Sequence, residues 1–281
     1  MARWDQIGSS GDVDDRRGLS PASMFAGGGA VVAVLITLGL NFLGINIPQS
    51  TVEDVINTVS SLDSRTAPKT DQPAEFKGED SYEQFAQKVV GSTDDVWTRI
   101  FSSNGLVYEK TQLVLFRDST NSGCGVATSA VGPHYCPSDS KIYLDETFFD
   151  KLQANYGAST GDVAQAYVIA HEVGHHVQNQ LGVFRFSDTT NQSTSIDIEL
   201  QADCYAGIWA YAQSNNNIFE PNEVTEALDA AAAVGDDNIQ RSSGYTVNPE
   251  TWTHGSSTER VAAFNMGLTS GDPSQCTNLQ S

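Results

Sequence analysis

Three of the chain's five histidines lie within six residues, in the stretch HEVGHH from His171 to His176. On a helix, residues four apart lie on one face, so His171 and His175 can bind one metal ion together. Glu172 follows the first histidine, where a carboxylate can take a proton from a water molecule at the metal. The spacing predicts a catalytic zinc site with His171 and His175 as ligands and Glu172 as general base.

A third ligand is expected in the stretch ELQAD, where Glu199 and Asp203 are again four residues apart. One carboxylate can bind the metal while the other accepts a hydrogen bond from the second ring nitrogen of a ligand histidine. A solvated acidic helix face is the alternative, but the residues that follow are largely apolar, and a buried carboxylate pair needs partners. We therefore predict Glu199 as the third zinc ligand and Asp203 as the residue that orients a histidine.

Two further histidines have less defined roles. His176 is rotated about 140° from His171 on a helical wheel, so it cannot easily bind the same ion, and we expect a structural or hydrogen-bonding role. His254 lies in the loop stretch THGSSTER and could donate a hydrogen bond to the oxygen that becomes negative when water attacks a carbonyl. A packed polar histidine without a catalytic role is the alternative for His254.

The elements that must hold these residues can be read from hydrophobic periodicity. The expected helices cover residues 81–103 (with a break near 91–92), 161–180, 195–213 and 221–234. The runs LVLF at 113–116 and KIYLD at 141–145 predict strands, and the segment between them, with two cysteines, predicts a loop or hairpin. Several helices with few strands, not in βαβ order, predict the α+β class.

A membrane anchor is expected before this domain. No charged residue occurs between Arg17 and Glu53, and residues 24–43 form an apolar segment long enough to span a bilayer as a helix. A cleaved signal peptide is the alternative, but no convincing cleavage site follows. Basic residues precede the segment and none follows it closely, which places the N-terminus in the cytoplasm. The predicted organisation is a cytoplasmic segment (1–23), a single transmembrane helix (24–43), a flexible tether (44–78) and an extracytoplasmic catalytic domain (79–281).

Charge and cysteine content narrow the choice of partners. The formal net charge is −20, with 15 basic and 35 acidic residues, which disfavours nucleic acid because its binding depends on Lys and Arg. The lipid bilayer is expected as a partner through the N-terminal helix. None of the four cysteines lies in a C-x-x-C pair, and in an oxidising compartment they would form two disulfides with three alternative connectivities.

Taken together, these motifs resemble the bacterial neutral zinc metallopeptidases, a family with an N-terminal anchor. The matching stretches are RWDQIGSSGDVDDRRG, SGCGVATSAVGPHYCPSDSKIYLD, GDVAQAYVIAHEVGHHVQ, ELQADCYAGIWA, VGDDNIQ and THGSSTER. The resemblance implies a zincin-like domain of the gluzincin type, in which a glutamate supplies the third ligand. It also implies a transition-state role for His254 and the disulfides Cys124–Cys136 and Cys204–Cys276.

The functional expectation is a membrane-anchored zinc peptidase that cleaves peptide or protein substrates with zinc-activated water. KIYLD is the expected edge strand along which an extended peptide would lie. The alternative is a zinc-containing binding or scaffold protein of the cell envelope without hydrolytic activity. Three ligands, rather than the four of a closed structural zinc site, and a glutamate at the base position favour the enzyme.

Overall fold

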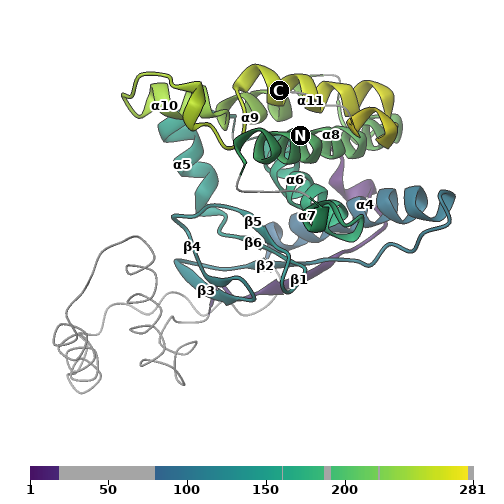
Figure 1. Cartoon of the computed structure of the whole chain (residues 1–281). Coiled ribbons are helices and arrows are strands. Elements are labelled where there is room, and N and C mark those ends of the chain that lie inside the picture. The colour runs from purple at the N-terminus through teal and green to yellow at the C-terminus, as the bar shows by residue number, and fades with distance from the viewer. Residues whose placement is uncertain (19–79, 160, 187–190, 221, 278–281) are drawn as a thin grey trace, which may run out of the picture. The chain divides into compact units, whose positions relative to one another are not determined.

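The computed structural model describes residues 1–18, 80–159, 161–186, 191–220 and 222–277. Residues Met1–Arg16 and Gly78–Ser281 form one compact unit, in which the N-terminal residues belong to the same fold as the rest (Figure 1). Its first elements are η1 (Trp4–Gln6), β1 (Asp12–Asp15), α4 (Ser81–Ser103), β2 (Gln112–Leu115), β3 (Ser119–Ser122), β4 (Gly125–Thr128), β5 (His134–Cys136) and β6 (Lys141–Leu144). The later elements are α5 (Thr147–Tyr156), α6 (Asp162–Gln180), α7 (Val183–Phe186), α8 (Gln192–Asn215), α9 (Val224–Ala233), α10 (Asp236–Ser242), η2 (Pro249–Thr251), α11 (Ser257–Ser270) and η3 (Pro273–Thr277).

The main sheet has the strand order β1-β2-β6-β5. The β1–β2 and β2–β6 pairs are parallel, whereas β5 is antiparallel to β6. Because strand side chains alternate between faces, Leu113 and Leu115 join the core with α4 and α6, while Val114 and Tyr143 form a smaller cluster with the β3–β4 hairpin. The predicted strands and the predicted hairpin excursion between them are therefore present.

Helix α6 lies between the sheet and helices α8 and α9. It contacts β5 and β6 on one side and α8 and α9 on the other, and α11 packs along α8 (Figure 1). The ends of α6 and α8 lie within three residues of the predicted bounds. A buried helix pair of this kind holds its side chains rigidly, which a metal site requires.

The predicted break in the helix over 81–103 is wrong, because α4 runs without interruption through Gly91. Gly91 instead marks a close crossing with the N-terminal segment. A Cβ atom at Gly91 would lie 2.8 Å from the backbone nitrogen of Gly11, nearer than a real contact allows. The glycine therefore serves packing rather than a turn, a distinction that a single sequence does not make.

The N-terminal segment is held by specific contacts with the domain. The indole nitrogen of Trp4 donates to Oδ2 of Asp162, the first residue of α6, at 2.7 Å, and the Trp4 ring meets Phe85 edge to face. The backbone nitrogen of Arg3 donates to the carbonyl of Ile218 at 2.8 Å. Strand β1 then pairs with β2 in register from Asp12 to Asp15. These residues complete the sheet and brace the start of α6.

The predicted fold class, α+β with a zincin-like domain behind one transmembrane helix, requires correction. The fold is mixed α/β, because three strands of the main sheet run parallel and α4 lies in the connection between β1 and β2. Within the described ranges no helix is long and apolar enough to cross a membrane. The segments 24–43 and 44–78 lie outside the described residues.

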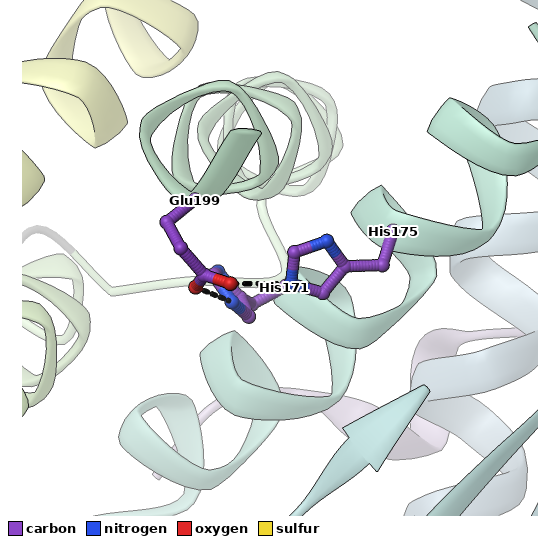
Figure 2. A group of neighbouring side chains, drawn as sticks. All are labelled: His171, His175 and Glu199. Carbon is purple, nitrogen blue, oxygen red and sulfur yellow. Dashed lines mark ion pairs between the residues drawn. The ribbon is translucent and has the colours of Figure 1, made fainter. Parts of the chain in front are cut away.

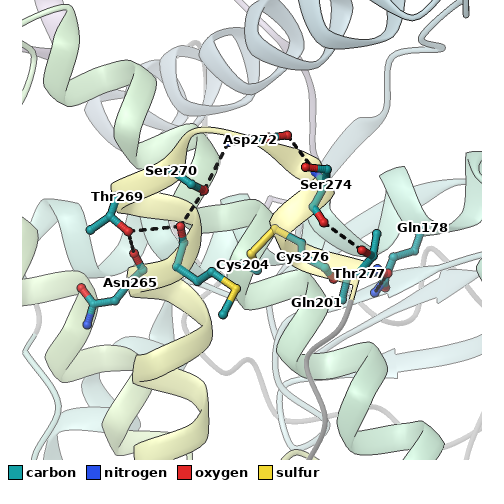
Figure 3. Close-up of a disulfide and its surroundings, with 11 residues drawn as sticks. Gln178, Gln201, Cys204, Asn265, Thr269, Ser270, Asp272, Ser274, Cys276 and Thr277 are labelled. Carbon is teal, nitrogen blue, oxygen red and sulfur yellow. Dashed lines mark hydrogen bonds between the residues drawn. A yellow bond between two sulfur atoms is a disulfide. The ribbon is translucent and has the colours of Figure 1, made fainter.

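Two disulfides join the four cysteines, in the pairing that the family resemblance implied. Cys124 is bonded to Cys136, which ties the β3–β4 hairpin to β5. Cys204 is bonded to Cys276, which ties η3 near the C-terminus to α8 (Figure 3). The second bridge closes a loop of 72 residues and so restricts the unfolded chain strongly.

Candidate functional site

Helices α6 and α8 bring three metal-binding side chains together. Nε2 of His171 lies 3.2 Å from Oε2 of Glu199, and Nε2 of His175 lies 3.4 Å from Oε1 of the same carboxylate (Figure 2). One ligand atom from each of the three residues lies within 4.8 Å of the others. Two imidazole nitrogens and one carboxylate are a donor set suited to zinc, with positions left for water or substrate.

The close approach of the two helices depends on Gly174, in the middle of the HEVGHH stretch. A Cβ atom at this position would lie 2.9 Å from the carbonyl oxygen of Ala202 and 3.0 Å from its Cα. Gly174 is one residue from His175, and Ala202 is one turn from Glu199. The glycine therefore sets the helix separation at which the carboxylate reaches the histidines.

Each ligand histidine is oriented through its second ring nitrogen. Nδ1 of His171 lies 2.8 Å from Oδ1 of Asp203, and Nδ1 of His175 lies 2.8 Å from Oε1 of Gln178. Since the Asp203 carboxylate and the Gln178 amide oxygen can only accept, both Nδ1 atoms carry protons. A neutral imidazole with its proton on Nδ1 presents the lone pair of Nε2 toward the shared point, and this is the tautomer that a metal ion requires.

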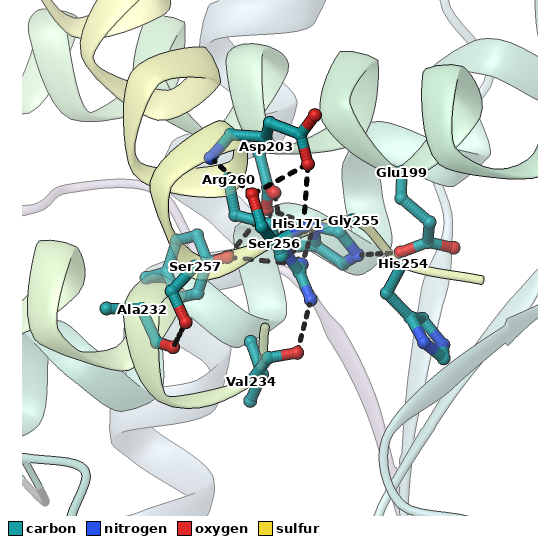
Figure 4. A network of polar contacts seen from close by, with 12 residues as sticks. His171, Glu199, Asp203, Ala232, Val234, His254, Gly255, Ser256, Ser257 and Arg260 are labelled. Carbon is teal, nitrogen blue, oxygen red and sulfur yellow. Dashed lines mark hydrogen bonds and ion pairs between the residues drawn. The ribbon is translucent and has the colours of Figure 1, made fainter. Parts of the chain in front are cut away.

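Asp203 is the centre of a fully buried polar network. Arg260 of α11 donates from Nε to Oδ2 at 2.7 Å and from Nη2 to Oδ1 at 2.9 Å (Figure 4). The hydroxyl of Tyr167 donates to Oδ1 at 2.6 Å. Asp203 is completely buried and Arg260 is 4% exposed, so the paired guanidinium replaces the solvation that the carboxylate loses. This network fixes the plane of the His171 ring.

Gln178 is likewise held in a chain of hydrogen bonds. Its amide nitrogen donates to the carbonyl of Ile198 at 2.7 Å and to Oε1 of Gln201 at 3.0 Å. The amide of Gln201 in turn donates to the carbonyl of Cys276 at 3.1 Å, beside the disulfide (Figure 3). The orientation of His175 is thus connected to the C-terminal bridge.

The electrostatics of the site favour positive charge between the histidines and Glu199. Burial opposes protonation of His171, but the carboxylates of Asp203 and Glu199 outweigh it and raise its pKa to about 10. The pKa of His175 is also raised, because Glu199 outweighs the effect of burial. Burial alone would raise the pKa of Glu199, but the two histidines hold it well below its usual range. A divalent cation bound at this point would supply the positive charge that the carboxylates favour, and both imidazoles would then be neutral.

The three residues lie in a groove of about 650 Å³. Glu172 lines this groove and is 6% exposed. His254 lines it from the loop before α11, and its Nδ1 lies 3.2 Å from Oδ1 of Asp236 and 2.9 Å from the hydroxyl of Thr253. The structure therefore brings all six predicted site residues to one place: His171, Glu172, His175, Glu199, Asp203 and His254.

The edge strand was assigned to the wrong residues. KIYLD forms β6, which is paired on both sides, with β2 and with β5. Strand β5 stands at the end of the sheet, and Pro133, His134, Tyr135 and Pro137 line the groove. The sequence did not indicate strand β5, because β5 is only three residues long and lies in a segment rich in glycine and proline.

Two positioning residues were not predicted, and their signals differ. Gln178 lies three residues after His175 on the same helix, so i,i+3 spacing alone could have suggested it. Arg260 is 57 residues from Asp203, and no local pattern connects them. His176 does not join the metal-binding group, as expected from its direction on the helix.

Comparisons with known proteins identify the family of this chain. The family described as "Putative neutral zinc metallopeptidase" matches residues 2–279. The Escherichia coli K12 protein YpfJ is 34% identical over 293 residues, which cover 99% of this chain and 98% of the relative. The Mycobacterium bovis protein Mb2605 is 43% identical over 198 residues, which cover 66% of each chain. Both relatives are named as uncharacterized proteins, and no solved structure matches. Because the family match spans nearly the whole sequence, the chain belongs to this family.

Proposed function

We propose that this protein is a zinc-dependent endopeptidase. The observation that supports the proposal most directly is the convergence of both Nε2 atoms and the Glu199 carboxylate in a groove that Glu172 also lines. In the proposed site His171, His175 and Glu199 hold the ion. When bound, zinc supplies Lewis-acid chemistry, by lowering the pKa of water and polarising a carbonyl.

The protein's own residues would then carry the proton transfers. Glu172 takes a proton from the attacking water molecule and later delivers it to the amine that leaves. His254 donates a hydrogen bond to the carbonyl oxygen as it becomes negative. Asp203 and Gln178 keep the two ligand imidazoles in the required tautomer and orientation.

The groove also indicates the class of substrate. Its walls combine the machinery above with mainly apolar side chains, namely Val131, Phe148, Val168, Phe184, Ile198, Val234 and Ile239. The guanidinium of Arg260 is occupied by Asp203 and cannot recognise an acidic substrate group. We therefore expect peptides with bulky apolar side chains near the cleaved bond to be preferred.

The test compares the wild-type chain with Glu172→Gln. The full chain is required, because residues 1–16 form part of the folded unit. One zinc ion per chain in both proteins, with cleavage of a peptide library by the wild type alone, is the expected result. Zinc binding in both with cleavage in neither would favour the alternative, a zinc-containing scaffold protein, and no zinc binding in either would refute the metal site.

We also propose that the domain works outside the cytoplasm. The two disulfides support this location, because such bonds persist mainly in oxidising compartments. External protease should cut a tag placed after Ser281 in spheroplasts, from which the outer envelope has been removed. Protection of that tag in intact spheroplasts, with digestion after lysis, would contradict the proposed location.

A further inference from the structure

His176, the third histidine of HEVGHH, faces away from the metal-binding pair and is 2% exposed. Its Nε2 lies 2.7 Å from the carbonyl oxygen of Glu109, and its Nδ1 lies 3.0 Å from the hydroxyl of Tyr135. A carbonyl oxygen can only accept, so Nε2 carries the ring proton and Nδ1 accepts from the Tyr135 hydroxyl. Both ring nitrogens are therefore used within the protein, and neither is available to a metal ion.

Tyr135 receives a second bond from the same helix. Its oxygen accepts from the amide nitrogen of Asn179 at 2.9 Å, so two side chains of α6 hold one hydroxyl. The rings of Tyr108 and Tyr135 meet the His176 imidazole edge to face, with centroids 5.6 and 5.4 Å away. Satisfied polar bonds inside an aromatic enclosure leave the Tyr135 side chain little freedom.

The backbone before β2 is tied to α6 at the same point. The side chain of Gln180 accepts from the backbone nitrogen of Glu109 at 2.9 Å and donates to the Glu109 carbonyl at 2.8 Å. The Glu109 carbonyl that holds Nε2 of His176 is therefore itself fixed relative to α6. The imidazole is held at both ends.

Tyr135 is the middle residue of β5, the strand at the end of the sheet and along the groove. Among the strands that the structure describes, β5 pairs with β6 alone in this sheet. A peptide that paired with the open side of β5 would lie beside the metal-binding residues. The distance between β5 and α6 then determines which peptide bond of the substrate lies next to Glu172.

We propose that His176 is a positioning residue which, by holding Tyr135, fixes the edge strand β5 relative to the metal helix α6 and so aligns a bound peptide with the catalytic groups. The inference rests on the proposed peptidase function and deepens it, because it assigns β5 as the strand that substrate pairs with. His176 touches neither the metal-binding group nor the groove, and it acts through Tyr135.

The test uses two substrates with the same cleaved bond. One is a peptide of about ten residues, long enough to run along β5, and the other is a capped dipeptide that cannot reach it. In the full chain, Tyr135→Phe removes only the hydroxyl and should lower kcat/KM for the long peptide about tenfold, mainly through KM. The loss of kcat/KM for the dipeptide should be much smaller, and the content of one zinc per chain should be unchanged.

Tyr108→Phe is the matched control, because it removes a hydroxyl from the other ring against His176 without touching the bonds that hold β5. It should leave both substrates unaffected. His176→Gln should resemble Tyr135→Phe, and the double variant should be no worse than the more severe single variant, because both changes break one connection.

Equal losses on both substrates, or loss of zinc from Tyr135→Phe, would show general damage to the metal helix and overturn the inference. Unchanged cleavage of the long peptide by Tyr135→Phe would overturn it as well. If the wild type cleaves both substrates and the variants match it, this inference alone fails. A wild type that cleaves neither substrate refutes the proposed function and the inference with it.

Discussion

Arg260 and Asp203 form a two-pronged ion pair beside the candidate metal site, with nitrogen–oxygen distances of 2.7 and 2.9 Å. Burial alone would raise the pKa of Asp203, but the Arg260 guanidinium and the His171 imidazole together lower it to about 2. The carboxylate stays charged inside the protein and can hold the ligand imidazole. A residue from α11 thus controls the geometry of a ligand on α6.

Replacing Arg260 with Met should therefore destabilise the fold and weaken zinc binding. The change leaves a buried carboxylate without its cation, which costs about 3–5 kcal/mol in the free energy of unfolding. Urea unfolding at neutral pH and competition with a zinc chelator measure the two effects. Arg241→Met is the control, because Arg241 is an exposed partner of Asp237 at 3.4 Å, and its loss should cost below about 1 kcal/mol. Similar costs for both variants would contradict the role given to Arg260.

Gln178→Leu should reduce zinc affinity on the order of 10- to 100-fold, the usual effect of losing a bond to a ligand histidine. The reason is that Nδ1 of His175 loses its acceptor, so the ring can rotate or adopt the other tautomer. Chelator competition gives the affinity directly. Gln153→Leu, at an exposed position on α5, is the control and should bind zinc as the wild type does. An unchanged affinity in Gln178→Leu would show that His175 needs no such partner.

Gly174→Ala should be unfavourable even though alanine is the better helix former. The added methyl group would force α6 and α8 apart at Ala202, with an expected cost of about 1–3 kcal/mol for overpacking. Zinc binding should weaken too, because Glu199 moves away from the histidines. Thermal unfolding with and without zinc measures both effects. Gly8→Ala, where no atom lies within 4 Å of the added carbon, should change neither; a stabilising effect of Gly174→Ala would disprove the helix-spacing argument.

Asp94 should make the protein less stable as pH rises. This carboxyl of α4 is 1% exposed, with the ammonium of the exposed Lys110 3.6 Å away, and burial raises its pKa from 3.8 to about 6. The folded state binds the proton more tightly than the unfolded state, so its contribution to stability is lost as pH rises from about 4 to about 6. Asp94→Asn should therefore raise the free energy of unfolding at pH 8 by about 2–3 kcal/mol.

The gain from Asp94→Asn should shrink to near zero at about pH 4, where the wild-type carboxyl is largely protonated in the folded state. Urea unfolding at the two pH values provides the comparison. Asp95→Asn, the exposed neighbour on the same helix, should change stability little at either pH. A gain of equal size at both pH values would mean that charge burial is not the cause.

Much of the local structure could be predicted because it depends on local periodicity. Helix α6 covers Asp162–Gln180 where 161–180 was expected, and β6 covers Lys141–Leu144 where 141–145 was expected. Strand β1 was missed, because DVDD contains one apolar residue and forms a strand only by pairing with β2. The β1–α4–β2 unit, and with it the fold class, depended on that missing strand.

The sequence by itself determined the donor set, because a helical repeat places His171 and His175 on one face whatever surrounds them, and Glu199 and Asp203 likewise. Only the tertiary structure determined which surroundings these donor side chains face and which other residues hold them in place. The helix separation at Gly174, the guanidinium of Arg260 against Asp203 and the position of β5 along the groove all arise between segments distant in the chain. Such contacts depend on how whole elements pack, and no local pattern of residues specifies them.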